Sequence, residues 1–418
     1  MLRRPPGARD PGHPPMTLGA ASDPTFRTDG RELRRLVAEL SEIHRPSASD
    51  GERQAAEWLV ARFAELGVEA RVERERVHGE YWLPLALLTG AGALAGAAAM
   101  TGRRAVGAAV AGAAAAAVWD DLTAGRRHFR RALPQREAHN VVASVGRPDA
   151  RRTVVLLAHH DAAHPGLIFH PAIPAFVWRR FPWLIEHHDT SPPVMFPVLA
   201  GPTLVALGAL TGSAALTATG TVICGGAPAV LADIGLRDAV PGANDNATGS
   251  VALLEIARAL VDAPPEHVRV LLVSTGSEES ILEGMQGFAR RHFAALPRSD
   301  TFFLNLDTLG SPHLTAIRGE GMLRMYDYDP RALELVDRTA EELGIWLFPN
   351  LRLRNATDSL VALKAGYAAA CLGSVTDYKA PANYHWPTDV ADNVDYGTFA
   401  DGIRLAGTIV RRLDERWL

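Results

Sequence analysis

The chain has 418 residues, and 43 Lys and Arg stand against 47 Asp and Glu, a formal net charge of -4. This balance excludes the basic surface that nucleic-acid binding requires, so no nucleic-acid partner is expected. The two cysteines, Cys224 and Cys371, are too few for a disulfide framework and too far apart in sequence for a metal knuckle. A reduced, intracellular setting is therefore permitted.

The N-terminal segment 1–29 is rich in Pro, Gly and Arg and has little apolar periodicity. This composition predicts a disordered tail and not a signal peptide. Met16 is a second candidate for the first residue of the protein. Apolar residues at helical spacing then predict two amphipathic helices between 29 and 67, with a break at Pro46. Alternating patterns predict three strands, at 68–77, 140–145 and 153–158.

An uncharged stretch separates the first two predicted strands. Residues 82–100 and 105–119 carry no charge, and a short polar break at 101–104 divides them. The pattern predicts a membrane hairpin over 81–119. The second arm is mostly Ala and Gly, which insert into lipid weakly, so a packed helical hairpin in a soluble protein is the alternative.

A second uncharged stretch runs from 190 to 232 and is long enough for two membrane spans hinged near Gly212. Its three prolines would kink the helices, and its many small residues suit close helix packing in lipid. We therefore expect a second membrane hairpin over 190–232, and a soluble apolar cap is the alternative.

Charges flank the two hairpins unequally. Five arginines crowd the exit of the first hairpin between 126 and 136, and Arg179 and Arg180 precede the second. The opposite turns hold only Arg103 and Arg104. Each hairpin returns the chain to the side that it left, so the positive-inside rule places the remainder of this multi-pass membrane protein in the cytoplasm.

Strand and helix patterns alternate after the second hairpin. They predict strands at 267–275 and 301–306, and helices at 250–261, 288–296, 331–343, 360–366 and 396–413. Such alternation favours an α/β fold, in which a mostly parallel mixed sheet is flanked by helices in an α/β/α sandwich. The segments 30–80, 120–190 and 233–418 would form this domain, with the two apolar hairpins inserted.

Polar residues follow the predicted strands at the edge where open α/β sheets bind their ligands. Those at strand ends are His159, the pair Glu278 and Glu279, and Asp307. Asp245 precedes a helix whose positive N-terminal end would hold its carboxylate, and His385 lies in a late loop. Each alone has an ordinary interpretation as a surface residue or helix cap. Together they form a ligand set for two zinc ions and leave one carboxylate as a base.

These residues lie in ordered motifs that resemble those of the zinc aminopeptidase family, which includes bacterial leucyl aminopeptidases, aminopeptidase Y and glutamate carboxypeptidases. The motifs are His159-His-Asp161, Asp245-Asn-Ala-Thr-Gly249, Gly276-Ser-Glu-Glu279, Asn305-Leu-Asp307 and Tyr384-His385-Trp-Pro-Thr-Asp389. The resemblance covers 31–77 and 137–413, apart from the second apolar insertion.

The resemblance implies two zinc ions per chain in a defined arrangement. His159 and Asp307 would bind one ion, and Glu279 and His385 would bind the other. Asp245 would bridge both, because two adjacent cations need a shared anion and Asp offers two oxygens on a short stem.

Two further residues receive roles from the resemblance. Glu278 would act as the general base that takes a proton from water and passes it to the leaving amine. Asp161 would orient the imidazole of His159. The implied activity is that of a membrane-associated aminopeptidase, which hydrolyses a peptide or an aminoacyl amide.

Two segments depart from the usual form of the family. Residues 280–285 replace its Gly-Leu-x-Gly-Ser, and Thr357-Asp358-Ser359 stands where the family has Ser-Asp-His. Both segments are expected to face the substrate and to bear on specificity. Structural or loop roles are expected for the remaining nearby histidines, His160, His164, His170, His187 and His188.

Three other functions fit parts of the pattern. A related amidohydrolase family inserts a dimerisation domain between its last two ligands, but Asp307 and His385 are only 78 positions apart. Glutaminyl cyclases share the fold with one zinc and perform acyl transfer, whereas the full ligand set favours two ions. A membrane scaffold or transporter with an inactive peptidase domain is disfavoured by the intact Glu278.

Overall fold

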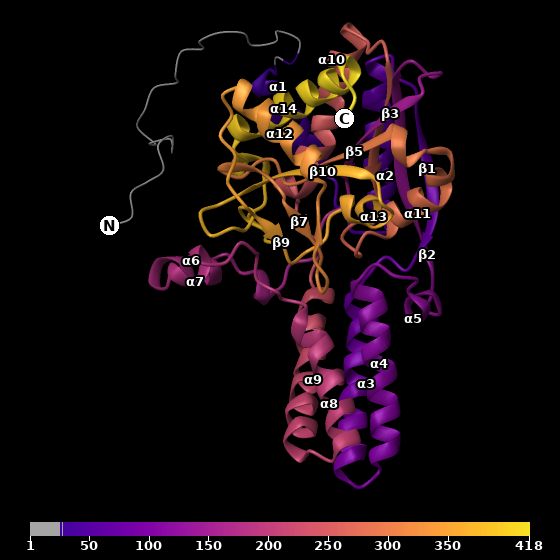
Figure 1. Cartoon of the computed structure of the whole chain (residues 1–418), viewed down its shortest axis with the longest axis vertical. Helices are drawn as coiled ribbons and strands as arrows, with labels where there is room; N and C mark the ends of the chain where they lie inside the picture. Colours follow the sequence, from indigo (N-terminus) through magenta and orange to yellow (C-terminus); the bar gives the residue numbers. More distant parts are fainter. Residues whose placement is uncertain (1–25, 27) are drawn as a thin grey trace.

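The computed structural model describes residue 26 and residues 28–418, so nearly all of the predicted tail lies outside the described residues. Phe26 is an exception to the predicted tail, because its side chain is buried in the main core, 5% exposed. The chain builds two parts of different composition, a mixed α/β domain and a bundle of apolar helices that projects from one end of it (Figure 1).

The α/β domain is organised by a seven-stranded sheet in the order β1-β2-β4-β3-β5-β10-β6. Its strands are β1 (Ala70–Val77), β2 (Arg136–Gly146), β3 (Arg152–His159), β4 (Val268–Thr275), β5 (Thr301–Leu306), β6 (His313–Ala316) and β10 (Ala368–Val375). The four strands β4, β3, β5 and β10 run parallel, whereas β1, β2 and β6 join through antiparallel pairs. The predicted α/β fold with a mixed sheet is confirmed.

Strand β10 lies inside the sheet, yet it was not predicted from the sequence. It begins with three alanines and continues through Cys371 to Gly373, so it lacks both the alternation and the branched residues that mark strands. A small second sheet was also not predicted; it consists of β7 (Gly319–Glu320), β8 (Tyr326–Asp327) and β9 (Arg352–Leu353).

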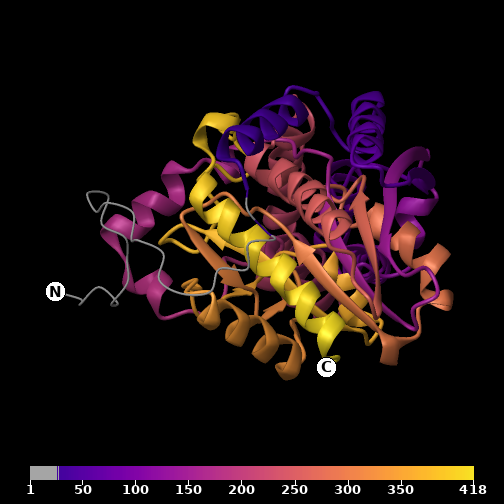
Figure 2. The ribbon, with the colours of Figure 1, turned by 90° about the horizontal axis from the view of Figure 1, so that it is seen from above.

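Helices cover both faces of the large sheet (Figure 2). Side chains alternate along each strand, so Val154 and Leu156 of β3 face one core while Val155 and Leu157 face the other. The first core lies under α1 (Gly30–Ser41), α2 (Asp50–Glu65), α10 (Thr248–Asp262), α12 (Pro330–Glu342) and α14 (Tyr396–Glu415). The second lies under α11 (Glu283–His292) and α13 (Ser359–Lys364).

Helix α11 lies earlier in the chain than the predicted helix at 288–296, which was wrong in its bounds. The structure ends the α-helix at His292 and continues with a single turn, η4 (Phe293–Ala295). The first turns of α11 are hard to predict from the sequence because they contain Gly284 and Gly287, and glycine weakens a helical pattern. At Gly284 only glycine fits, since an added Cβ would lie 1.9 Å from the carbonyl oxygen of Gly276.

Two helical hairpins form the bundle (Figure 1). Its helices are α3 (Trp82–Met100), α4 (Arg104–Leu122), α8 (Phe196–Thr211) and α9 (Ala214–Gly235). Among the described helices, α3, α4 and α9 are long and apolar enough to cross a membrane, and α8, with 16 residues, is shorter. The second hairpin begins at Phe196 and not at 190, because residues 190–195 include two consecutive prolines that lie outside the helix.

Small residues hold the bundle together, while large apolar residues point outward. A Cβ on Gly96 of α3 would lie 1.9 Å from Thr221 Oγ1 of α9, and one on Gly220 would lie 2.6 Å from the backbone nitrogen of Val205 in α8. Leu94 and Val222 expose about three quarters of their surfaces. This distribution is the reverse of a soluble bundle and is typical of helices that pack in lipid.

The upper end of the bundle packs directly on the loops at the carboxyl ends of the sheet strands. Leu85 of α3 and Ile234 of α9 share one buried cluster with Ile281 and Leu282, which follow β4, and with Leu360 of α13. Short helical segments also lie near this junction; they are α5 (His128–Arg131), η2 (Leu167–Phe169), α6 (Ala172–Arg180) and α7 (Trp183–Glu186). The ligand-binding edge of the sheet therefore faces the bundle.

Candidate active site

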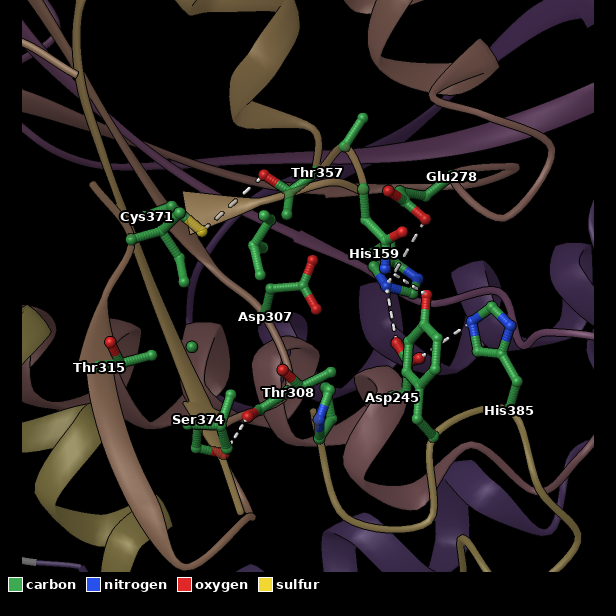
Figure 3. A pocket seen from close by; sticks show the side chains of 18 of the residues that line it. His159, Asp245, Glu278, Asp307, Thr308, Thr315, Thr357, Cys371, Ser374 and His385 are labelled. Carbon is green, nitrogen blue, oxygen red and sulfur yellow. Dashed lines mark hydrogen bonds and ion pairs between the residues drawn. The ribbon is translucent and has the colours of Figure 1, made fainter. Parts of the chain in front are cut away.

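The parallel strands bring the predicted site residues to one edge of the sheet. His159 is the last residue of β3, Asp307 follows β5, and the acidic pair lies just beyond β4. Asp245 lies in a distorted turn, η3 (Ala243–Ala247), directly before α10. All six predicted metal and base residues line one cavity of about 560 Å³ (Figure 3); they are His159, Asp245, Glu278, Glu279, Asp307 and His385.

Two overlapping groups of three ligands share Asp245. His159, Asp245 and Asp307 form one group, and Asp245, Glu279 and His385 form the other, with the ligand atoms of each within 4.8 Å of one another. Asp245 Oδ1 lies 3.3 Å from His159 Nε2, and its Oδ2 lies 3.4 Å from His385 Nε2. Each oxygen of one carboxylate therefore faces a different group.

Glu278 lies beside both groups. Its Oε2 is 4.0 Å from His159 Nε2, farther than the oxygen of Asp245. It also forms a third group with His159 and Glu279 within the same 4.8 Å limit. The structure thus brings the predicted base to the boundary between the two ligand groups.

Asp161 is fully buried behind the cavity and connects three parts of the site. Its Oδ1 accepts a hydrogen bond from the backbone N–H of Glu278, and its Oδ2 accepts one from that of Glu279, each at 3.1 Å. Ser47 Oγ donates to Oδ2 at 2.6 Å, and His159 Nδ1 lies 3.4 Å from Oδ1. The carboxylate therefore positions the acidic pair, and the imidazole is held by the backbone carbonyl oxygen of Asp161, 3.2 Å from His159 Nδ1, together with this carboxylate.

Two positioning residues were missed by sequence reasoning. Asp389 accepts hydrogen bonds from the backbone N–H groups of Asn244 at 2.8 Å and Asp245 at 3.0 Å. The position of Asp389 at the end of the Tyr384-His385 motif could have indicated a role in the site. Arg45 is fully buried and donates to the carbonyl oxygens of His160 at 2.6 Å and Gly242 at 2.6 Å. Its role could not be predicted from the sequence, because it is a single arginine in a polar segment that belongs to no motif.

The chain is similar to known proteins in a sequence family and in fold. The model of Peptidase family M28 matches residues 228–410. The predicted resemblance to the zinc aminopeptidases is confirmed. A search of curated proteins found no match.

Solved structures of two peptidases and a glutaminyl cyclase share the fold across most of the chain. The aminopeptidase from Aneurinibacillus sp. strain AM-1 aligns over 93% of this chain and 94% of its own, with a TM-score of 0.53 and 14% identity. A Zn-dependent exopeptidase from Parabacteroides distasonis aligns over 94% and 99%, with a TM-score of 0.52 and 14% identity. Bacteroides thetaiotaomicron glutaminyl cyclase aligns over 93% and 98%, with a TM-score of 0.54 and 14% identity. At this identity the similarity establishes the zinc-peptidase fold and not the reaction.

The electrostatics of this site favour bound cations. Burial raises the pKa of Asp307 to about 7, and it raises the pKa of Glu278 well above its usual range. Burial lowers the pKa of His385, but the nearby carboxylates of Glu279 and Asp245 more than offset this and raise it to about 10. Crowded buried carboxylates are costly without positive partners, so bound cations would stabilise this cluster.

The donor set fits zinc. Two buried oxygens, Asp245 Oδ2 and Glu279 Oε1, have no hydrogen-bond partner among the described residues. Both belong to carboxylates in the ligand groups, and imidazole nitrogen and carboxylate oxygen are ordinary zinc donors. The zinc that the fold family implies therefore matches the residues present.

The cavity walls agree only in part with the predicted specificity segments. Thr357 lines the cavity, as expected, but 280–282 does not. Ile281 and Leu282 instead pack beneath the helical bundle. The sequence departs from the family pattern at the residues that contact the inserted hairpins, and these contacts require apolar side chains.

The loop residues around His385 complete the cavity. The ring of Tyr384 stacks on His385 with centroids 3.8 Å apart, and Phe169 of η2 packs edge-on against His385 at 4.7 Å. His160 points away from both ligand groups and bonds to Ser274 Oγ at 2.9 Å, in agreement with the expected structural role.

Proposed function

We propose that this protein is a membrane-associated di-zinc peptidase, specifically an aminopeptidase, that hydrolyses peptide or amide bonds. The observation that carries the proposal is the division of Asp245 between two ligand groups, one on each of its oxygens. A site for a single ion has no use for this arrangement, and a shared carboxylate is what two adjacent divalent cations require.

Each ligand has a defined part in this proposal. His159 and Asp307 would hold one zinc ion, Glu279 and His385 would hold the other, and Asp245 would contribute to both sites. Zinc bound there would polarise the scissile carbonyl and lower the pKa of bound water to about 7. The unpartnered oxygens of Asp245 and Glu279 would then gain the partners that they lack.

Glu278 performs the proton transfers. Burial raises the pKa of its carboxyl well above the usual range, which favours a group that accepts a proton and later donates it. Its backbone N–H is held by Asp161 at 3.1 Å, so the carboxylate has a defined position at the junction of the ligand groups. In the reaction it takes a proton from the attacking water and passes it to the leaving amine.

Apolar side chains in the cavity wall suit an apolar substrate residue. Ile317, Leu353 and Val375 line the cavity together with Pro381. None of these side chains carries a charge to recognise a basic or acidic residue. We therefore expect faster release of leucine than of lysine or aspartate from otherwise equal substrates.

The membrane setting is part of the proposal. The bundle exposes leucines, valines and methionine along its length, and α6 and α7 add exposed Ile173, Phe176 and Trp183 at the same end of the domain (Figure 1). Arginines gather at the domain end, whereas the far turn of the first hairpin holds Arg103 and Arg104. This asymmetry supports a multi-pass protein whose catalytic domain is cytoplasmic.

The active site would then lie close to the membrane surface. Tyr81, the residue before α3, is buried against the domain, and the charge of Glu279 contributes to the raised pKa of its hydroxyl, after the larger effect of burial. A substrate presented at the bilayer would have a short path to the ligand groups.

The test is metal content and activity of the full chain, purified in detergent without chelator. We expect about two zinc ions per chain and release of amino acids from aminoacyl amides. Glu278→Gln should keep the zinc and lose about 10²- to 10⁴-fold in kcat, because it removes only the base. Glu341→Gln is the matched control, since Glu341 is exposed on α12 and remote from the cavity.

The outcomes separate the alternatives. One zinc per chain, with cyclisation of N-terminal glutamine and no amino acid release, would establish a glutaminyl cyclase, the activity named for several similar structures. Absence of zinc, or full turnover by Glu278→Gln, would contradict the proposed chemistry. Sedimentation with membranes before detergent is added tests the membrane setting separately.

A further inference from the structure

A second cavity, of about 840 Å³, lies where the first hairpin meets the catalytic domain. Its wall combines the end of β1, the α5 turn and one face of α11 (Figure 1). The residues that line it are Arg76, Arg127, Arg130, Arg131, Gln135, Glu283, Gln286 and Arg290. We refer to it as the arginine pocket. It shares no lining residue with the candidate active site.

Positive charge exceeds negative charge in the arginine pocket. Arg130 is paired with Asp121 and lies 3.3 Å from Glu283, so its charge is balanced. The carboxylate of Glu283 also accepts from two backbone N–H groups, at 3.0 and 2.9 Å. In the described part of the chain, neither Arg76 nor Arg131 lies within ion-pair distance of a carboxylate. These two guanidinium groups are exposed to solvent and contribute positive charge that no carboxylate of the pocket wall pairs with.

Arg127 is the third arginine of the pocket with unused hydrogen-bond donors, and the only one of these three that is buried. It is only 3% exposed, and one of its amino groups donates to the carbonyl oxygen of Ile281. Its Nε and Nη1 are buried and have no hydrogen-bond partner in the described structure. Burial lowers the pKa of this guanidinium to about 10, so it still carries its charge at neutral pH. A buried cation with two free donors is costly unless a ligand satisfies it.

A phosphate group has the chemistry that this wall would recognise. Planar guanidinium groups bind phosphate through paired hydrogen bonds, and several of them are needed to balance its charge. The pocket also lies just beyond the end of α4, where Trp119 is 46% exposed. Exposed tryptophan marks the boundary between lipid and water, and basic pockets on the cytoplasmic side of that boundary bind lipid headgroups.

We propose that the arginine pocket binds a phosphate group, offered either by an anionic phospholipid headgroup or by free phosphate. The lipid source rests on the proposed membrane setting, whereas the phosphate site itself does not. The occupant would also adjoin the active-site loop, because Arg127 and Arg130 donate to the carbonyl oxygens of Ile281 and Ser280 just after the acidic pair.

The test compares two double variants with equal loss of charge. Arg76→Gln/Arg131→Gln removes the two exposed, unpaired arginines of the pocket and leaves buried Arg127 intact, so folding is preserved. Arg126→Gln/Arg136→Gln removes two exposed arginines from the same connection, outside the pocket. Each full-length protein, in detergent, is titrated by calorimetry with short-chain phosphatidate and, separately, with inorganic phosphate.

We expect saturable binding of phosphatidate, weakened about thirtyfold by the pocket variant and less than about twofold by the control variant. Inorganic phosphate that competes with phosphatidate would identify the phosphate group alone as the ligand. Binding of phosphatidate without such competition would identify the lipid as the source. Absence of saturable binding of either probe, or equal weakening in both variants, would overturn the proposal. The readout does not depend on peptidase activity or on zinc.

Discussion

Replacement of Asp161 by Asn tests whether one buried carboxylate positions both the acidic pair and a zinc ligand. Asparagine keeps the shape of the side chain but converts one oxygen into a donor. Oδ2 accepts from Ser47 and from the N–H of Glu279, whereas Oδ1 accepts from the N–H of Glu278 and lies 3.4 Å from His159 Nδ1. The amide nitrogen is therefore expected at the Oδ1 position, where it faces the N–H of Glu278.

The magnitude follows from this lost interaction. A hydrogen bond to a charged group contributes about 1.5 to 3 kcal/mol, and the variant leaves a buried N–H unsatisfied beside the proposed base. The imidazole of His159 also loses a negative partner 3.4 Å from its Nδ1. We expect zinc affinity to fall about tenfold to a hundredfold, the range found when partners of metal ligands are removed.

The assay is competition for zinc with a chelator of known affinity, together with kcat measured at saturating zinc. Ser47→Ala, which removes only the hydroxyl donor to Asp161, should lower zinc affinity about fivefold. Asp149→Asn is the control, because that aspartate is exposed and pairs only with Arg147. If Asp161→Asn binds zinc as tightly as the control, the positioning role is refuted.

Two further predictions concern the bundle and the pH dependence. Gly220→Val should lower the midpoint of thermal unfolding by a few degrees, because a Cβ at this position would lie 2.6 Å from a backbone nitrogen of α8. The control is Gly225→Val on the same helix. A Cβ there meets nothing within 4 Å, so the midpoint should stay unchanged. Chelator-treated protein should lose stability between pH 5 and pH 8, since burial raises the pKa values of Asp307, Asp358 and Asp389 to about 7. Above about pH 4 the unfolded chain has released these protons, whereas the folded state still holds them. The stabilisation that the three protonated carboxyl groups give the folded state is therefore lost as the pH rises through 7. A midpoint of thermal unfolding that rises over this interval would contradict that reasoning.

The strand-end residues of the candidate site could be predicted because local pattern and geometry coincide there. His159 and Asp307 each follow a buried apolar run, and parallel strands deliver their carboxyl ends to one edge. The helical hairpins could also be predicted, since an uncharged stretch is a property of composition alone. In both cases the signal lies within a few neighbouring residues.

Other features depended on contacts between distant segments. Strand β10 is a strand because β5 and β6 flank it, and its own alanines do not require it. Arg45 and Asp389 support the loop of Asp245 from far away in the sequence, through backbone groups that have no sequence code.

The sequence by itself thus determined the chemical groups, their strand-end positions and the presence of two apolar hairpins. The tertiary structure alone decided that Ile281 and Leu282 support the bundle and that hairpin-exit arginines line a second pocket. The reason is physical. Side-chain type and periodicity are local properties, whereas burial, pairing and unsatisfied charge arise only when segments far apart in the chain come into contact.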